Sequence, residues 1–80
     1  MSKIIIEGTV KSVIYQNPDN GYTICEVSSK TEGDFSAVGY MPTIRPADEA
    51  SLTGDWVTHP EYGEQFKVEL YETIMPSDKT

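Results

Sequence analysis

The sequence predicts a single all-β domain, and three observations lead to that fold class. The chain has 80 residues, which is enough for one domain. Its apolar runs are short and rich in Ile, Val, Thr, Tyr and Phe, and Gly, Pro, Asn and Asp separate them at close intervals. Apolar and polar residues alternate with a period of two in the clearest runs, as half-buried strands require.

The first three runs predict three strands. Residues 4–15 form a run that is long for one strand, and its apolar face shifts between Gly8 and Ser12. This shift predicts a β-bulge that lets one strand serve two sides of a barrel. Residues 22–27 are apolar on both sides and predict a central strand, and residues 35–40 predict a shorter third strand.

Residues 51–58 and the final run predict the last two strands. Gly54 lies between Leu52 and Trp56 on the inward face, which predicts a bend or the close approach of another backbone. The prolines of the 41–50 connection leave room for one helical turn at most. In the final run, the predicted inward residues are Phe66, Val68, Leu70 and Ile74, and the predicted outward ones are Gln65, Lys67, Glu69 and Thr73.

Five strands with this spacing predict a five-stranded Greek-key barrel, the OB-fold. Three strands precede the connection at residues 41–50 and two follow it. An SH3-like barrel stays the alternative, because strand number alone does not exclude it. We expect the domain to span residues 1–76 and residues 77–80 to begin a linker to a motor domain.

Charge and cysteine content restrict the partners and the compartment. Thirteen acidic residues against six scattered basic ones give a net charge of −7, so we expect weak DNA binding or none by this chain alone. Cys25 is the only cysteine, and neither an export signal nor a membrane-spanning apolar run is visible. These features predict a reducing, cytoplasmic location and no membrane contact.

The chain lacks the residue patterns of an active site. It has no nucleophile motif, no metal-ligand spacing and no phosphate-binding loop. His59 stands directly before Pro60 and is interpreted as a turn residue. We therefore expect no catalytic, cofactor-binding or metal-binding residue in this fragment, which is not an enzyme by itself.

The candidate contact residues for DNA or a partner are Tyr62, Lys67 and Tyr71. Tyr62 lies in the turn that leads into the last strand. Lys67 and Tyr71 are four residues apart on the polar side of that strand, so simple alternation places them on one face. Exposed aromatic rings can stack on nucleic-acid bases, at roughly 1–3 kcal/mol per base. Trp56 and Phe66, in contrast, lie on apolar faces and are predicted to belong to the core.

Five segments in this order and spacing resemble the N-terminal domain of the long, RecD-like bacterial ATP-dependent DNA helicases. The likeness covers residues 5–76, and one departure is Ala47, near which the family pattern leads us to expect a glycine. The segments are Gly8-Thr9-Val10, Asn17-x-x-Asn20-Gly21-Tyr22-Thr23-Ile24, Val38-Gly39-Tyr40-Met41-Pro42, Leu52-Thr53-Gly54-Asp55-Trp56 and His59-Pro60-x-Tyr62-Gly63-x-Gln65-Phe66-Lys67-Val68.

The resemblance implies a much longer parent protein. Such parents, related by name to the exodeoxyribonuclease V alpha subunit, use ATP and magnesium to unwind DNA from 5′ to 3′ in repair and recombination. It implies that this chain is a non-catalytic accessory domain, with the remainder of the helicase as its partner and DNA contacted through the parent. An autonomous single-stranded-DNA-binding OB module is the alternative function.

Overall fold

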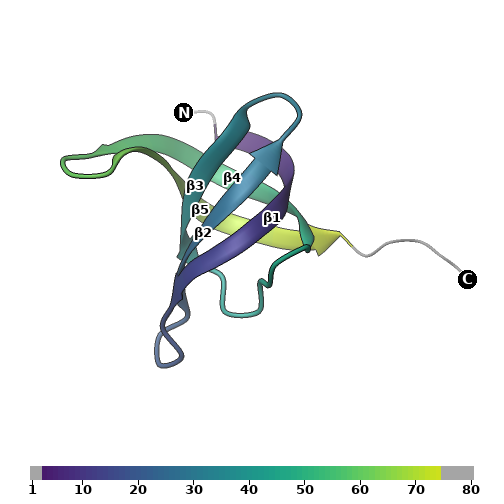
Figure 1. Ribbon diagram of the computed structural model, residues 1–80, viewed down its shortest axis with the longest axis vertical. Helices are drawn as coiled ribbons and strands as arrows, with labels where there is room; N and C mark the ends of the chain where they lie inside the picture. Colours follow the sequence, from purple (N-terminus) through teal and green to yellow (C-terminus); the bar gives the residue numbers. More distant parts are fainter. Residues whose placement is uncertain (1–2, 75–80) are drawn as a thin grey trace, which may run out of the picture.

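The computed structural model describes residues 3–74, which form five strands closed into a barrel (Figure 1). The order around the barrel is β1-β2-β3-β5-β4, and β4 pairs again with β1. Neighbouring strands are antiparallel except for β3 and β5, which are parallel. The predicted five-stranded barrel, an OB-fold, is confirmed. The strands are β1 (Ile4–Gln16), β2 (Tyr22–Ser29), β3 (Gly33–Tyr40), β4 (Glu49–His59) and β5 (Gly63–Ile74).

Strand β1 serves two sides of the barrel, as its sequence predicts. Residues 4–9 pair with β4, and residues 9–16 pair with β2. The β1–β2 register shifts between Val10 and Ser12 and again between Val13 and Tyr15. Bulges increase the local twist of a strand, and these two turn β1 around the barrel.

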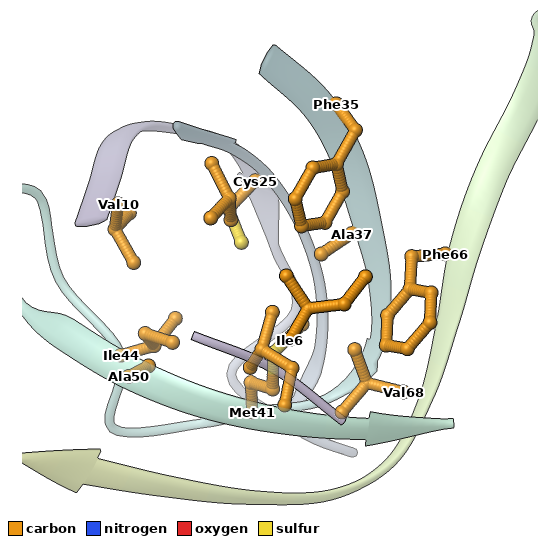
Figure 2. Close-up of a cluster of buried hydrophobic side chains, with 12 residues drawn as sticks. Ile6, Val10, Cys25, Phe35, Ala37, Met41, Ile44, Ala50, Phe66 and Val68 are labelled. Carbon is orange, nitrogen blue, oxygen red and sulfur yellow. The ribbon is translucent and has the colours of Figure 1, made fainter. Parts of the chain in front are cut away.

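The core fills the barrel, and Figure 2 shows Phe35 and Phe66 at one side of it. Phe35, Trp56 and Phe66 meet edge to face, with ring centroids 5.1–5.9 Å apart. Phe66 is fully buried, whereas Trp56 is partly exposed and packs against the core. The buried cluster consists of Ile6, Val10, Cys25, Val27, Phe35, Ala37, Met41, Ile44, Ala50, Leu52, Phe66 and Val68.

The connection between β3 and β4 contains turns and no helix. Its buried side chains Met41 and Ile44 enter the core from this segment. The Gln16 amide donates hydrogen bonds to the Met41 and Ile44 carbonyls, at 3.2 and 3.4 Å, and the Thr23 hydroxyl donates to the Met41 carbonyl at 3.0 Å. These polar contacts replace the backbone pairing that a regular element would provide.

The predicted inward face of β5 is wrong beyond Val68. In the pairing with β4, Thr53 lies opposite Leu70 and Gly54 lies opposite Val68, so Glu69 is an extra residue in β5. An extra residue reverses the alternation that follows it. Leu70 is consequently 70% exposed, although the sequence pattern places it in the core.

Gly54 confirms the predicted close approach of another backbone. A Cβ atom at this position would lie 1.9 Å from the carbonyl oxygen of Lys67 on β5. No side chain fits in that space, so β4 and β5 can approach one another this closely only because Gly54 has no side chain.

Ala47 adopts a left-handed conformation, with φ of 76°, and no other non-glycine residue among 3–74 has a positive φ. This residue lies in the turn where the family pattern leads us to expect a glycine nearby. The Ala47 N–H still donates to the Val10 carbonyl at 2.8 Å, so the turn keeps its place against β1. The strain is therefore local to one residue.

Replacing Ala47 by Gly is expected to stabilise the domain by about 0.5–1 kcal/mol. A left-handed backbone costs an L-residue ~1–2 kcal/mol, and glycine avoids this strain. Part of the gain is offset because glycine loses more backbone entropy on folding. Thermal unfolding should show a midpoint raised by roughly 2–8 °C. The matched variant Ala47→Val should lower the midpoint. A lower midpoint for Ala47→Gly would contradict the left-handed turn.

Candidate functional site

Tyr62 lies at the tip of the β4–β5 hairpin, which extends away from the barrel (Figure 1). Its side chain is 72% exposed, and its ring lies against the His59 ring, with centroids 4.7 Å apart. His59 Nδ1 accepts hydrogen bonds from the N–H groups of Glu61 and Tyr62, at 3.0 and 3.3 Å. His59 therefore closes the turn, as predicted, and it also positions Tyr62.

Lys67 and Tyr71 do not share a face, contrary to the prediction from simple alternation. Lys67 is exposed and lies opposite Asp55, whereas Tyr71 lies opposite the fully buried Leu52. Tyr71 packs against the core, and its hydroxyl lies 2.8 Å from the Thr43 hydroxyl. The extra residue in β5 between Lys67 and Tyr71 causes this reversal.

Lys67 instead lies in a row of paired residues that runs across β5, β3, β2 and β1. It is opposite Val38 on β3, Val38 is opposite Ile24 on β2, and Ile24 is opposite Tyr15 on β1. Residues directly opposite one another on neighbouring strands project to the same side. The predicted basic residue thus belongs to the outer surface of β1, β2 and β3 and not to a strip along β5.

Two further tyrosines lie beside that row. Tyr22 on β2 is directly opposite Tyr40 on β3, and their side chains are 42% and 66% exposed. The Tyr40 ring lies over Gly21, where a Cβ atom would be 2.6 Å from the ring. We call the group of outward side chains the tyrosine surface: Tyr15, Tyr22, Ile24, Tyr40 and Lys67.

The sequence interpretation missed the tyrosine surface because β2 reverses the usual pattern. Thr23 points inward and is fully buried, with its hydroxyl donating to the Gly21 and Met41 carbonyls. Tyr22 points outward. Because the inward residue is a polar threonine and the outward one a tyrosine, the sequence here does not show apolar residues alternating with polar ones. The turn residues around Gly21 indicate only where β2 begins.

Several charged residues are already engaged in ion pairs. Lys3 contacts Asp55 and Glu69, and both carboxylates raise the pKa of its ammonium group, Glu69 more strongly. Lys11 contacts Asp34 at 2.7 Å, which raises the pKa of Lys11 and lowers that of Asp34. All of these groups are exposed, so each pair adds little to stability.

Lys67 forms no ion pair with any residue in the range 3–74. Because Lys3 and Lys11 are engaged by carboxylates, Lys67 is the cation of the tyrosine surface that can meet an external anion. The geometry thus offers an exposed aromatic surface with one lysine, bordered by Glu26 on β2 and Asp55 on β4. Such a surface suits stacking or protein contact and does not resemble a catalytic cleft.

The chain as a whole matches a family model described as the OB-fold domain of the ATP-dependent DNA helicase YrrC, over residues 3–76. The chain belongs to this family. No solved structure matches it. The match agrees with the closed five-stranded barrel and places the chain as an OB-fold domain from a DNA helicase family.

The described part of this OB-fold domain offers no catalytic constellation. Burial raises the pKa of the Cys25 thiol to about 11, so the reactive thiolate is scarce at neutral pH. No group of three His, Cys, Asp or Glu residues within 3–74 could hold a metal ion.

No helix that could cross a membrane occurs among residues 3–74.

Replacing Tyr71 by Phe is expected to lower the free energy of unfolding by about 0.5–1 kcal/mol, because the bond to the Thr43 hydroxyl is lost. Urea unfolding of Tyr71→Phe, Thr43→Ala and the double variant should show that the two losses do not add. Tyr62→Phe is the control, because its hydroxyl forms no hydrogen bond within residues 3–74. If the losses in unfolding free energy were additive, the Tyr71 and Thr43 hydroxyls would not interact.

Proposed function

We propose that this OB-fold domain is a non-catalytic, N-terminal accessory domain of a RecD-like 5′ to 3′ DNA helicase that acts in DNA repair and recombination. It docks on the motor of its parent or on a partner protein. The observation that carries the proposal is the match of residues 3–76 to the OB-fold domain of an ATP-dependent DNA helicase. The parent acts in the cytoplasm and uses ATP and magnesium through motor residues beyond this domain, which residues 77–80 begin to link.

The charge of the chain supports docking over autonomous DNA binding. The net charge of −7 opposes the approach of a phosphate backbone. Two of the basic residues, Lys3 and Lys11, are held by carboxylates of the same chain. Few cations therefore remain to release counterions from a nucleic acid.

A single-strand-binding role is the second candidate, and the tyrosine surface is the observation that favours it. OB-folds bind oligonucleotides on the face of strands 2 and 3, where Tyr22 and Tyr40 are opposite one another. Stacking contributes roughly 1–3 kcal/mol per base. Lys67, which is exposed on the same surface, adds one phosphate contact. Binding of this kind would depend mainly on stacking and only weakly on salt.

The accessory role is tested by comparing the full-length parent with a parent that lacks residues 1–76. We expect single-strand-stimulated ATP hydrolysis by the full-length protein and by the shortened one, and slower unwinding of a 5′-tailed duplex by the shortened one. The isolated domain should hydrolyse no ATP, because it has no phosphate-binding loop. Loss of ATP hydrolysis from a folded shortened parent would assign the domain to the catalytic machinery and contradict the proposal.

The two candidate functions separate in a titration of labelled oligo-dT into the isolated domain. We expect a Kd no tighter than roughly 10⁻⁴ M at physiological salt, the weak end of non-specific binding. Micromolar binding would favour the second candidate. In that case Tyr40→Leu should weaken it about tenfold or more, corresponding to the loss of one stacked base.

Two controls make the titration specific to the tyrosine surface. Tyr62→Leu changes an exposed tyrosine on the hairpin tip and should leave binding through the tyrosine surface within twofold. Lys67→Gln should reduce the slope of log K against log salt by about 0.7, the value for one phosphate contact on a single strand. Binding that is lost with Tyr62→Leu and kept with Tyr40→Leu would move the contact to the hairpin.

A further inference from the structure

The outer face of β1, β4 and β5 carries exposed aliphatic side chains among carboxylates. Ile5 and Leu70 are 66% and 70% exposed, and both lie opposite Thr53 on the strand between them. Each row crosses the three strands in the order β1, β4, β5. The rows are Ile5–Thr53–Leu70, Glu7–Ser51–Glu72 and Thr9–Glu49–Ile74.

A groove of about 480 Å³ lies along the β1 side of this face. Its apolar wall consists of Ile5 and Ile74, and its carboxylates are Glu7 and Glu49. The turn between β2 and β3 forms the opposite rim and supplies Lys30. We call these rows and this groove together the acidic face.

The carboxylates of the acidic face lack internal partners. Glu7, Glu49 and Glu72 form no ion pair within residues 3–74. Glu7 and Glu72 lie on either side of Ser51, so two like charges lie in one row. An external cation placed over this row would meet both carboxylates and relieve their repulsion.

We propose that the acidic face is the docking surface of the domain and that its occupant is a basic segment of the motor portion of the same parent chain. In that segment a Lys or Arg contacts Glu7 and Glu72, and an adjacent aliphatic side chain packs between Ile5 and Leu70. The proposal rests on the proposed function, because it assumes a parent that contains a motor.

Charge complementarity selects this occupant over two others. A nucleic acid would bring phosphates against Glu7, Glu49 and Glu72, and a second copy of the domain would bring the same carboxylates, so that in either case three carboxylates outnumber the one lysine of the groove, Lys30. The position of Ile74 adds a geometric reason. This residue ends β5 and lines the groove, so a motor that follows in the parent chain is tethered at the acidic face.

Carbodiimide cross-linking of the full-length parent, followed by mass spectrometry, tests the proposal directly. The reagent joins a carboxylate to a lysine amine only where the two are in contact. We expect amide links from Glu7, Glu49 or Glu72 to lysines beyond residue 80, and these links should weaken at high salt. Links from these residues only to lysines of another copy, or no links beyond residue 80, would overturn the proposal.

A matched pair of variants shows whether the carboxylates hold the segment. Glu7→Gln/Glu72→Gln keeps side-chain size and should make the linker after Ile74 at least threefold more sensitive to limited proteolysis in the full-length parent. Glu61→Gln/Glu64→Gln alters the exposed β4–β5 hairpin and should leave proteolysis unchanged. Equal proteolysis of the two double variants, with unchanged unfolding midpoints, would overturn the proposal.

ATP hydrolysis by the full-length parent shows whether a negative cross-linking result contradicts the docking surface or the proposed function. If the parent hydrolyses ATP and the cross-links are missing, the docking surface is wrong and the accessory function stands. If the parent hydrolyses no ATP, the proposed function itself is wrong.

Discussion

The structure depends on the close passage of β5 between two glycines. Gly54 on β4 leaves room for the Lys67 carbonyl, and Gly39 on β3 leaves room for the Val68 carbonyl, which would lie 2.6 Å from an added Cβ atom. Of two consecutive carbonyl groups of β5, the first thus lies against β4 and the second against β3. A small barrel closes only if its strands approach this closely, so the two glycines set where β5 lies.

The bulge that follows this passage decides what the surfaces of the domain contain. Before Glu69, β5 points Phe66 and Val68 into the core and Lys67 outward. After Glu69 the alternation is reversed, so Leu70 points outward and Tyr71 packs against the core. One extra residue therefore separates Lys67 from Tyr71 and places Leu70 among carboxylates. The net charge of −7 conceals this division, because it averages an acidic face with an aromatic surface that contains Lys67.

The features that depend on local chemistry could be predicted from the sequence. The five strands, the bulge in β1, the close approach at Gly54 and the role of His59 in its turn all follow from residue type and spacing. The unusual backbone at Ala47 was indicated by a missing glycine. The bulge in β5 gave no such signal, because Glu69 is a polar residue in a run that alternates well on both sides of it. An error of one residue there moved Leu70 and Tyr71 to the wrong faces.

The two surfaces do not compete for one occupant. The acidic face covers the first half of β1, β4 and the end of β5, whereas the tyrosine surface covers β2, β3, the second half of β1 and Lys67 on β5. A protein segment bound to the first would leave Tyr22 and Tyr40 open. The proposed docking would need little intrinsic affinity, because a motor that follows Ile74 in the parent chain would hold the segment at an effective concentration of about millimolar. Exposed carboxylates and two aliphatic side chains would bind a free partner only weakly, and the proposed tether would offset that weakness for a segment of the same chain.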